Sequence, residues 1–297
     1  MGHWLCVAAF RRVCLFGEPG SRPAGPHVHD PLTNLFGVSQ CELELPRPGT
    51  SVAFLFETEP GDCPVPAAPA RRAFVTPELF RFFEELAKNN RRDWFQRNKE
   101  RYHAVVRDPL LEFVQALGPA LERVSRYVVA DPRPVGGALF RIYRDTRFAK
   151  DKTPYKTHAG VHFRHARADD VHSLGYYLHL EPGNVFVGAG IWHPGSEPLR
   201  AIRGAIAAHP ERWKRAAEDR GFRRHFDLSG ETLTRTPRGF DPEHPLAAEI
   251  RRKDYIGVAN LTQAEASRAD FPERFASLAA AASPFMGFLA RALGAPW

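Results

Sequence analysis

Two runs of alternating apolar and polar residues, separated by a short turn signal, constrain the fold of this chain most. Leu174–Glu181 and Val185–Trp192 have the two-residue period of strands, and Pro182-Gly183-Asn184 between them is typical of a hairpin turn. A tight hairpin joins antiparallel strands, whereas parallel strands need a long crossover. The pattern therefore predicts an antiparallel sheet.

Helical periodicity lies on both sides of this hairpin. We expect helices over residues 76–88, from Asn90 onward, and over 108–126, 199–208, 211–219, 245–252 and 270–293, with Pro284 interrupting the last. Further strands are expected over 138–144, 158–164 and 255–259. The economical solution is an α+β fold, an antiparallel sheet of about four or five strands covered by the N-terminal and C-terminal helices.

The chain of 297 residues divides by composition near residue 72. All four cysteines and several Pro/Gly-rich stretches precede this point, so residues 1–72 are expected to be an extension, disordered or arising from a mis-annotated start. The alternative is a small ordered appendage built on Leu43–Phe56. Residues 73–297 are expected to form a single domain, which without cysteine cannot hold a thiolate metal site or a cysteine nucleophile.

Targeting signals are weak. The first apolar stretch has no basic residues before it and is cut short by Arg11 and Arg12, unlike a signal peptide. No run of 18 uncharged apolar residues occurs. These features predict a cytoplasmic protein without a membrane span.

The net charge of +7 has an uneven distribution. Residues 1–72 hold six basic and seven acidic residues, so the positive excess belongs entirely to residues 73–297. A basic domain suits an anionic partner, such as a phosphorylated small molecule or a nucleic acid.

The densest chemistry lies between Arg141 and Lys156, where six basic residues stand against two acids and are interleaved with aromatic rings. Arginine grips carboxylate or phosphate at two points, and tyrosine adds a hydroxyl donor. The candidate ligand-binding residues here are Arg141, Tyr143, Arg144, Asp145, Arg147, Lys150, Lys152, Tyr155 and Lys156. An equally weighted alternative is a network of ion pairs that pins the segment to the rest of the domain.

Strand alternation adds three candidates. Alternate side chains share a face, so Ala159, Val161 and Phe163 should meet the core, while His158 and His162 lie on the opposite face. On the next strand the residues opposite the core are Tyr177, His179 and Glu181. His158, His179 and Glu181 are therefore candidate site residues, with a solvated sheet face as the alternative.

The positions of one glycine and two histidines indicate which ligands the predicted sheet could bind. Gly160 would let a ligand or another chain approach the sheet closely. His158 and His162 would be about 13 Å apart along a strand, too far to share one metal ion. The sequence consequently predicts no metal site, and it leaves the cofactor unknown.

Three hypotheses follow. The first is a binding module for an anionic small molecule or nucleic acid, which uses the Arg141–Lys156 segment. The second is an enzyme acting on an anionic small molecule, in which Asp145, His158, His179 or Glu181 moves protons. The third is a structural ion-pair lock, with the function in a protein interface. Whether the chain is an enzyme stays open.

Four stretches resemble the domain-of-unknown-function family 2461, a group of conserved hypothetical proteins. They are Asn89–Phe95 with Asn98, Lys99 and Tyr102; Phe140–His158; Gly175–Gly183; and Pro237–Pro245. The resemblance extends from about Phe74 to Leu293. It implies a bacterial, soluble, single-domain protein and implies no established activity, cofactor or catalytic residue.

The Arg141–His158 segment gives a geometric prediction. Residues before Asp145 and after Thr157 should be strand, with an ordered loop between them. Clustered cations repel one another, so we expect Arg141, Arg144 or Arg147 to be substantially buried and paired, near His179 or Glu181.

Overall fold

The computed structural model describes residues 72–167 and 172–297. All of them belong to one compact unit, Pro64–Trp297. Apart from Arg72, the expectations for residues 1–72 concern residues outside the described ranges.

A five-stranded antiparallel sheet forms the centre of the α+β fold, as the sequence predicts. Its order is β1 (Ala159–Arg164), β2 (Gly175–Glu181), β3 (Asn184–Ile191), β5 (Tyr255–Leu261) and β4 (Asp227–Ser229). The hairpin pairs Glu181 with Asn184, and Gly183 at the turn has φ +77°, a conformation that glycine adopts without a steric penalty.

Helices precede and follow the first three strands. Before them lie α1 (Pro77–Lys88), α2 (Arg92–Arg97), α3 (Lys99–Tyr102), the π-helical turn η1 (His103–Arg107) and α4 (Asp108–Val124). After them lie α5 (Ser196–Ala208), α6 (Pro210–Ala217), α7 (Arg220–His225), α8 (Ala247–Ile250), α9 (Gln263–Ala266) and α10 (Phe271–Ala292).

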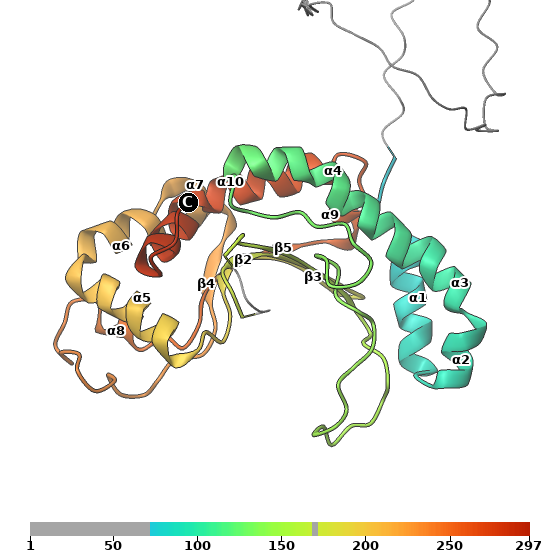
Figure 1. Ribbon diagram of the computed structural model, residues 1–297, viewed down its shortest axis with the longest axis horizontal. Coiled ribbons are helices and arrows are strands. Elements are labelled where there is room, and N and C mark those ends of the chain that lie inside the picture. Colours follow the sequence, from blue (N-terminus) through green and yellow to red (C-terminus); the bar gives the residue numbers. More distant parts are fainter. Residues whose placement is uncertain (1–71, 168–171) are drawn as a thin grey trace, which may run out of the picture. The chain divides into compact units, whose positions relative to one another are not determined.

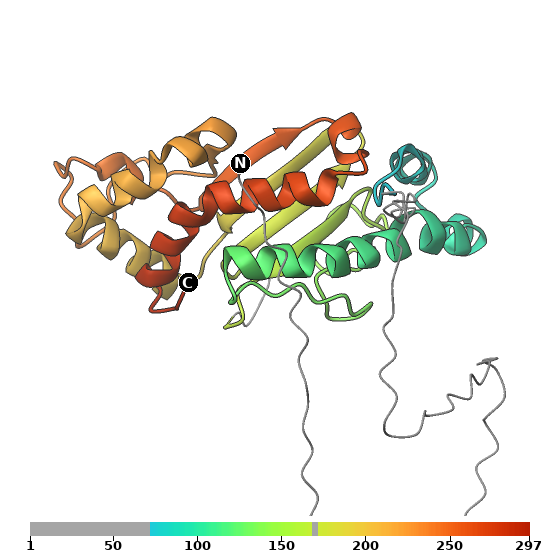
Figure 2. The ribbon, with the colours of Figure 1, turned by 90° about the horizontal axis from the view of Figure 1, so that it is seen from above.

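Helices α4 and α10 run side by side across one face of the sheet (Figures 1 and 2). The strand residues beneath them are the predicted apolar sets, including Val161, Phe163, Tyr176 and Leu178, and all of these are fully buried. Burying such a side chain contributes about 1.5–3 kcal/mol. This face fixes the register, and it thereby fixes which residues meet on the opposite face, called the open face below.

Helix α10 is continuous through Pro284. It is the one helix in the described ranges that is long and apolar enough to cross a membrane, but 56% of its most apolar window is buried within the fold. Core helices of soluble proteins have the same character, and its side chains pack against the sheet and α4.

Residues 138–144 were expected to form a strand and do not. Leu139 makes one isolated bridge to Val161, after which the chain leaves β1. Its backbone then pairs with the returning part of the same segment, through Arg144 N–H to Pro154 O at 2.9 Å and Lys156 N–H to Ile142 O at 2.8 Å. The segment bonds to itself and extends as a loop away from α4 and α10 (Figure 1).

Other differences are smaller. The N-cap of α2 is Arg91, since Asn90 is used elsewhere, and α8 is shorter than the expected helix over 245–252. Helix α7 and strand β4 were not predicted, because each is too short to display a period.

Candidate functional site

A chain of hydrogen-bonding side chains lies along the open face of β2. The Tyr177 hydroxyl is 3.1 Å from His179 Nδ1, and His179 Nε2 is 3.2 Å from Glu181 Oε2. Because the strand period is two residues, these three side chains project from the same face. The sequence predicted this grouping, and β2 is an interior strand, so the neighbouring strands shield it.

His158 joins the group from the adjacent chain segment. The register pairs Ala159 with Leu180 and Gly160 with His179, so the next position, His158, lies beside Glu181 and diagonal to His179. The His158 and His179 ring centroids are 4.5 Å apart. One potential ligand atom from each of His158, His179 and Glu181 lies within 4.8 Å of the others.

Glu181 has two further contacts. Thr157 Oγ1 donates to Oε1 at 3.3 Å, and Asn184 Nδ2 donates to Oε2 at 3.3 Å. Phe186, on the neighbouring strand β3, stacks on the His179 ring, with ring centroids 4.7 Å apart. The carboxylate and the imidazole are thus held by neighbours on both sides.

Burial dominates the electrostatics of this group. It lowers the pKa of His158 to about 4, with His179 adding to the effect, and raises the pKa of Tyr177 to about 12. For Glu181, burial raises the pKa, but the hydrogen bonds from His179 and Asn184 outweigh it and leave the pKa below its usual value. At neutral pH His158 and Tyr177 are uncharged and Glu181 is ionised.

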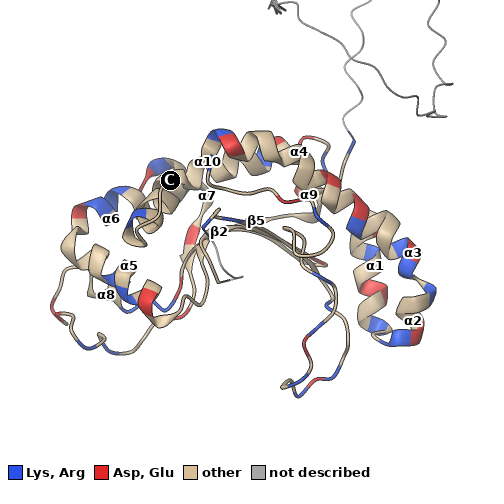
Figure 3. Cartoon of the chain, viewed as in Figure 1, with Lys and Arg blue, Asp and Glu red and all other residues tan. Residues whose placement is uncertain are grey.

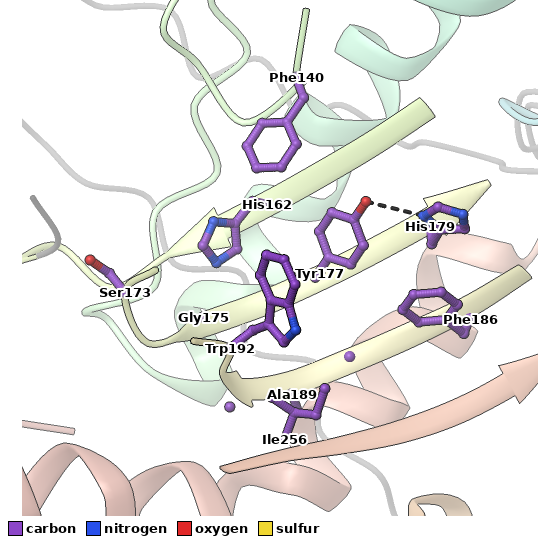
Figure 4. Close-up of a pocket in the computed structure, with 12 residues that line it drawn as sticks. Phe140, His162, Ser173, Gly175, Tyr177, His179, Phe186, Ala189, Trp192 and Ile256 are labelled. Atoms are coloured by element: carbon purple, nitrogen blue, oxygen red, sulfur yellow. Dashed lines mark hydrogen bonds between the residues drawn. The ribbon is translucent and has the colours of Figure 1, made fainter. Parts of the chain in front are cut away.

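A cavity of about 400 Å³ lies on the open face beside His179 (Figure 4). Three of the strand positions that line it, Gly175, Gly188 and Gly190, have no side chains, and a Cβ at residue 188 would meet only an ordinary contact, 3.6 Å from Tyr177 Cβ. The side chains around this gap belong to Phe140, His162, Ser173, Tyr177, His179, Phe186, Ala189, Trp192 and Ile256. Most of this lining is apolar or aromatic, and its volume falls within the range of small-molecule sites.

Gly160 has a different role from the one expected. A Cβ at this position would lie 2.6 Å from the Tyr177 hydroxyl, so the glycine makes room for the Tyr177 ring. The close approach to the sheet is therefore made by a residue of the same chain, and it orients the hydroxyl toward His179.

Lys156 brings positive charge to this side of the sheet. It is half-buried, and its Nζ is 5.4 Å from the ring centroid of Phe140, which lines the cavity. Burial lowers the pKa of Lys156, and the nearby Arg141 lowers it further. Two cations are thus near one another at this edge, an arrangement that an anion would stabilise.

Most of the remaining charges of the segment have partners within the loop. Arg144 bonds Asp151 and the Thr153 hydroxyl, Arg147 bonds Asp145 at 2.7 Å, and Lys152 Nζ donates to Thr146 O at 2.9 Å. Acidic residues lie among the basic ones along this loop in Figure 3. The Arg144–Asp151 and Arg147–Asp145 contacts are ion pairs of the kind that the structural-lock hypothesis expects.

The burial expected for the arginines is found only in part, at Arg144, which is partly buried and paired with Asp151. Arg141 and Arg147 are exposed, and the Arg144 side chain retains 30% of its exposure. Lys150 is also exposed. Arg144 and Arg147 are paired with acids of the loop itself, so the loop can be ordered without placing these arginines in the protein interior.

The base of the loop is anchored by contacts that sequence reasoning missed. The Asn90 amide donates to Tyr155 O at 2.9 Å and accepts from Tyr155 N–H at 3.1 Å, so it pairs with both polar groups of one residue. Tyr155 stacks on Phe95 with centroids 4.2 Å apart, and Tyr143 packs against both rings. Asn90 precedes a helix and looked like a helix cap, so its sequence context concealed this contact.

Comparison with known protein families agrees with the resemblance seen in the four sequence stretches. The family described as conserved hypothetical protein (DUF2461) matches residues 78–288. The chain belongs to the DUF2461 family. No curated protein and no solved structure gives a significant match. Three of the four stretches that resemble DUF2461 meet in the region described above, through Asn90, the 140–158 segment and β2.

Sequence reasoning also missed the cavity itself. Trp192 and Phe140 both line it, but they lie far apart in the sequence, and no local pattern connects them. A spacing of glycines at 188 and 190 on one strand face was the available signal, since it leaves a gap wherever the flanking residues are large.

Proposed function

We propose that this DUF2461 protein binds a small organic anion with a planar apolar body in the open-face cavity. The observation that carries the proposal is the cavity of about 400 Å³ with aromatic walls and a half-buried lysine beside one wall. The apolar part of the ligand would lie over the glycines, between Phe186 and Trp192. Its carboxylate or phosphate would approach Lys156.

The charges of the loop favour a small anion over a nucleic acid. Arg144 and Arg147 already bind Asp151 and Asp145. A nucleic acid would have to displace these pairs along the loop, whereas a single anionic group needs only Lys156 and Arg141.

We also propose the bacterial cytoplasm as the location.

The alternative hypothesis of an enzyme retains fewer candidate proton-transfer residues than the sequence suggested. Asp145 is exposed, and its hydrogen bonds from Arg147 lower its pKa to about 2, so it is a poor proton-transfer group at neutral pH. The alternative therefore rests on His158, His179 and Glu181 near the cavity.

Naphthalene-2-carboxylate and its neutral analogue 2-naphthamide provide a matched pair of probes, measured by calorimetry or ligand-observed NMR. Lys156→Met should weaken carboxylate binding by at least about tenfold, because a charge-assisted hydrogen bond contributes about 1.5–3 kcal/mol. It should leave the amide unaffected. Lys150→Met, in the same loop and exposed, is the control.

Gly188→Leu tests the position of the ligand. A Cβ at residue 188 would lie 3.6 Å from Tyr177 Cβ, an ordinary contact, so the leucine can occupy the cavity without disturbing the strand. Both probes should then lose binding. Retained binding would contradict the proposal. Salt-sensitive binding of single-stranded DNA that requires Arg144 and Arg147 would instead support the nucleic-acid hypothesis.

A further inference from the structure

We propose that His158, His179 and Glu181 form a binding site for a divalent first-row transition metal ion. Two imidazoles and one carboxylate offer ligand atoms within 4.8 Å of one another, from two neighbouring chain segments. The sequence analysis compared histidines along a single strand and expected no metal. Pairing across strands brings together a different set.

The ligand types fit such an ion. Two histidines and one carboxylate bind zinc in catalytic sites and iron(II) in facial triads, and both leave coordination positions open. An ion about 2.0–2.2 Å from each donor would draw the three side chains slightly closer than they are now. His179 also lines the cavity, so the open positions would be accessible to a ligand from that side.

The contacts around the three residues have the form of an outer coordination shell. His179 Nε2 faces Glu181, and the ion would take the place of the proton between them. His179 Nδ1 would then donate to the Tyr177 oxygen at 3.1 Å. Thr157 and Asn184 hold the Glu181 carboxylate. Such partners orient metal ligands and fix the histidine tautomer.

The position of His158 favours a metal site over a simple row of hydrogen-bonded side chains. The Tyr177–His179–Glu181 contacts alone already give both ring nitrogens of His179 a partner. His158 approaches the same point from the segment that precedes β1, and its ring lies 4.5 Å from that of His179. A third donor converging on one location is what a metal ion requires.

The test uses the full-length protein without an affinity tag, dialysed against Zn²⁺ or Co²⁺. Metal content is measured by mass spectrometry and affinity by calorimetry. His158→Ala and Glu181→Gln should each bind one equivalent fewer than the wild type. If residual binding persists, it should be weaker by at least the ten- to hundredfold that loss of an outer-shell partner costs.

His162→Ala is the matched control. His162 lies on β1, on the same face as His158, but outside the three-residue set. This variant should bind as much metal as the wild type. Cysteines and histidines within residues 1–71 can contribute a separate background, which is equal in all variants, and Co²⁺–thiolate absorption identifies it.

Circular dichroism without metal establishes that each variant is folded. Should His158→Ala fail to fold, Glu181→Gln preserves the shape of the side chain and carries the test. Equal metal content and equal affinity in the wild type and a folded Glu181→Gln variant would overturn the proposal, as would a wild type that binds no metal.

The metal site does not rest on the proposed organic anion. Gly188→Leu should abolish binding of the naphthalene probes and retain the metal. Glu181→Gln should lose the metal, and metal-free wild-type protein should still bind the probes through Lys156. The two proposals can therefore fail separately.

Discussion

Two polar regions of this protein differ in how their charges are held. The loop between Arg141 and Lys156 has the higher density of charge, and its ion pairs lie at the surface between residues close in sequence. The open-face group, which consists of His158, Tyr177, His179 and Glu181, has few charges. It brings His158 together with residues more than twenty positions away, and His179 within it is buried.

The difference concerns what each region needs from the fold. The Arg147–Asp145 pair spans two residues and could form in many conformations of the loop. The approach of His158 to His179 and Glu181 requires the register of β1 against β2, and so it requires the whole core. Polar groups held by tertiary structure are therefore the stronger candidates for a site.

Asn90→Ala should have the largest effect on stability, because Asn90 connects the helical N-terminal region to the base of the loop. It removes two hydrogen bonds and leaves both polar groups of Tyr155 without these partners. We expect a loss of about 3 kcal/mol in the free energy of unfolding, measured in urea. Asn98→Ala, which loses one local bond to Trp94 O, should cost about 1 kcal/mol. Equal losses would mean that the anchor is unimportant.

Gly160→Ala should break the open-face group while sparing the loop. The added Cβ would lie 2.6 Å from the Tyr177 hydroxyl, so the ring must move away from His179. Overpacking of this kind costs about 2 kcal/mol. Gly188→Ala is the control on the same sheet face, because its Cβ meets Tyr177 Cβ at an ordinary 3.6 Å. Denaturation, with the His179 ring resonances in NMR, measures both effects, and an unchanged His179 signal in Gly160→Ala would contradict the role of Gly160.

The sequence predicted the regular part of the fold because apolar alternation has a direct physical cause. The residues assigned to the core on β1 and β2 are buried, and the polar group opposite them was predicted residue by residue. The strand over 138–144 was wrong, because only residues 138–140 bond to β1, whereas the backbone groups of Ile142 and Arg144 find partners within their own loop. A local sequence pattern does not show whether a backbone group will bond to a neighbouring strand or to its own loop.

The site was only partly predictable for a related reason. Placing His179 and Glu181 on one face needs the strand period alone, whereas placing His158 against them needs the register, which depends on packing beneath the sheet. The cavity depends further on a missing side chain, since Gly188 leaves space in a lining that also includes Trp192. Absent side chains give a weak signal in a sequence.

Arg144→Ala should alter the loop and leave global stability nearly unchanged. The Arg144 and Asp151 side chains retain 30% and 59% of their exposure, and surface pairs of this kind contribute little. We expect the same urea midpoint as for Arg147→Ala, whose pair is more exposed, together with faster proteolysis within the loop. A loss of stability as large as that of Asn90→Ala would show that the loop is a structural lock.

The smallest expected effect is the pH response of the loop acids. Hydrogen bonds from Arg147 and Arg144 lower the pKa values of Asp145 and Asp151 to about 2, from an ordinary 3.8. A lowered pKa means that the folded loop favours the ionised form. Its contribution to loop order is therefore complete above pH 3.8 and is lost as the pH falls toward 2.

Carboxyl chemical shifts between pH 6 and pH 3 measure this directly. Both aspartates should remain mostly ionised at pH 3, where an ordinary aspartate is mostly protonated. Arg147→Ala should return the pKa of Asp145 toward 3.8 without affecting Asp151, and Arg144→Ala should do the reverse, because each pair is separate. High salt should reduce both shifts, since the groups are exposed. If either arginine variant changed both aspartates, the loop would be one coupled network, and the contrast with the open-face group would be weaker.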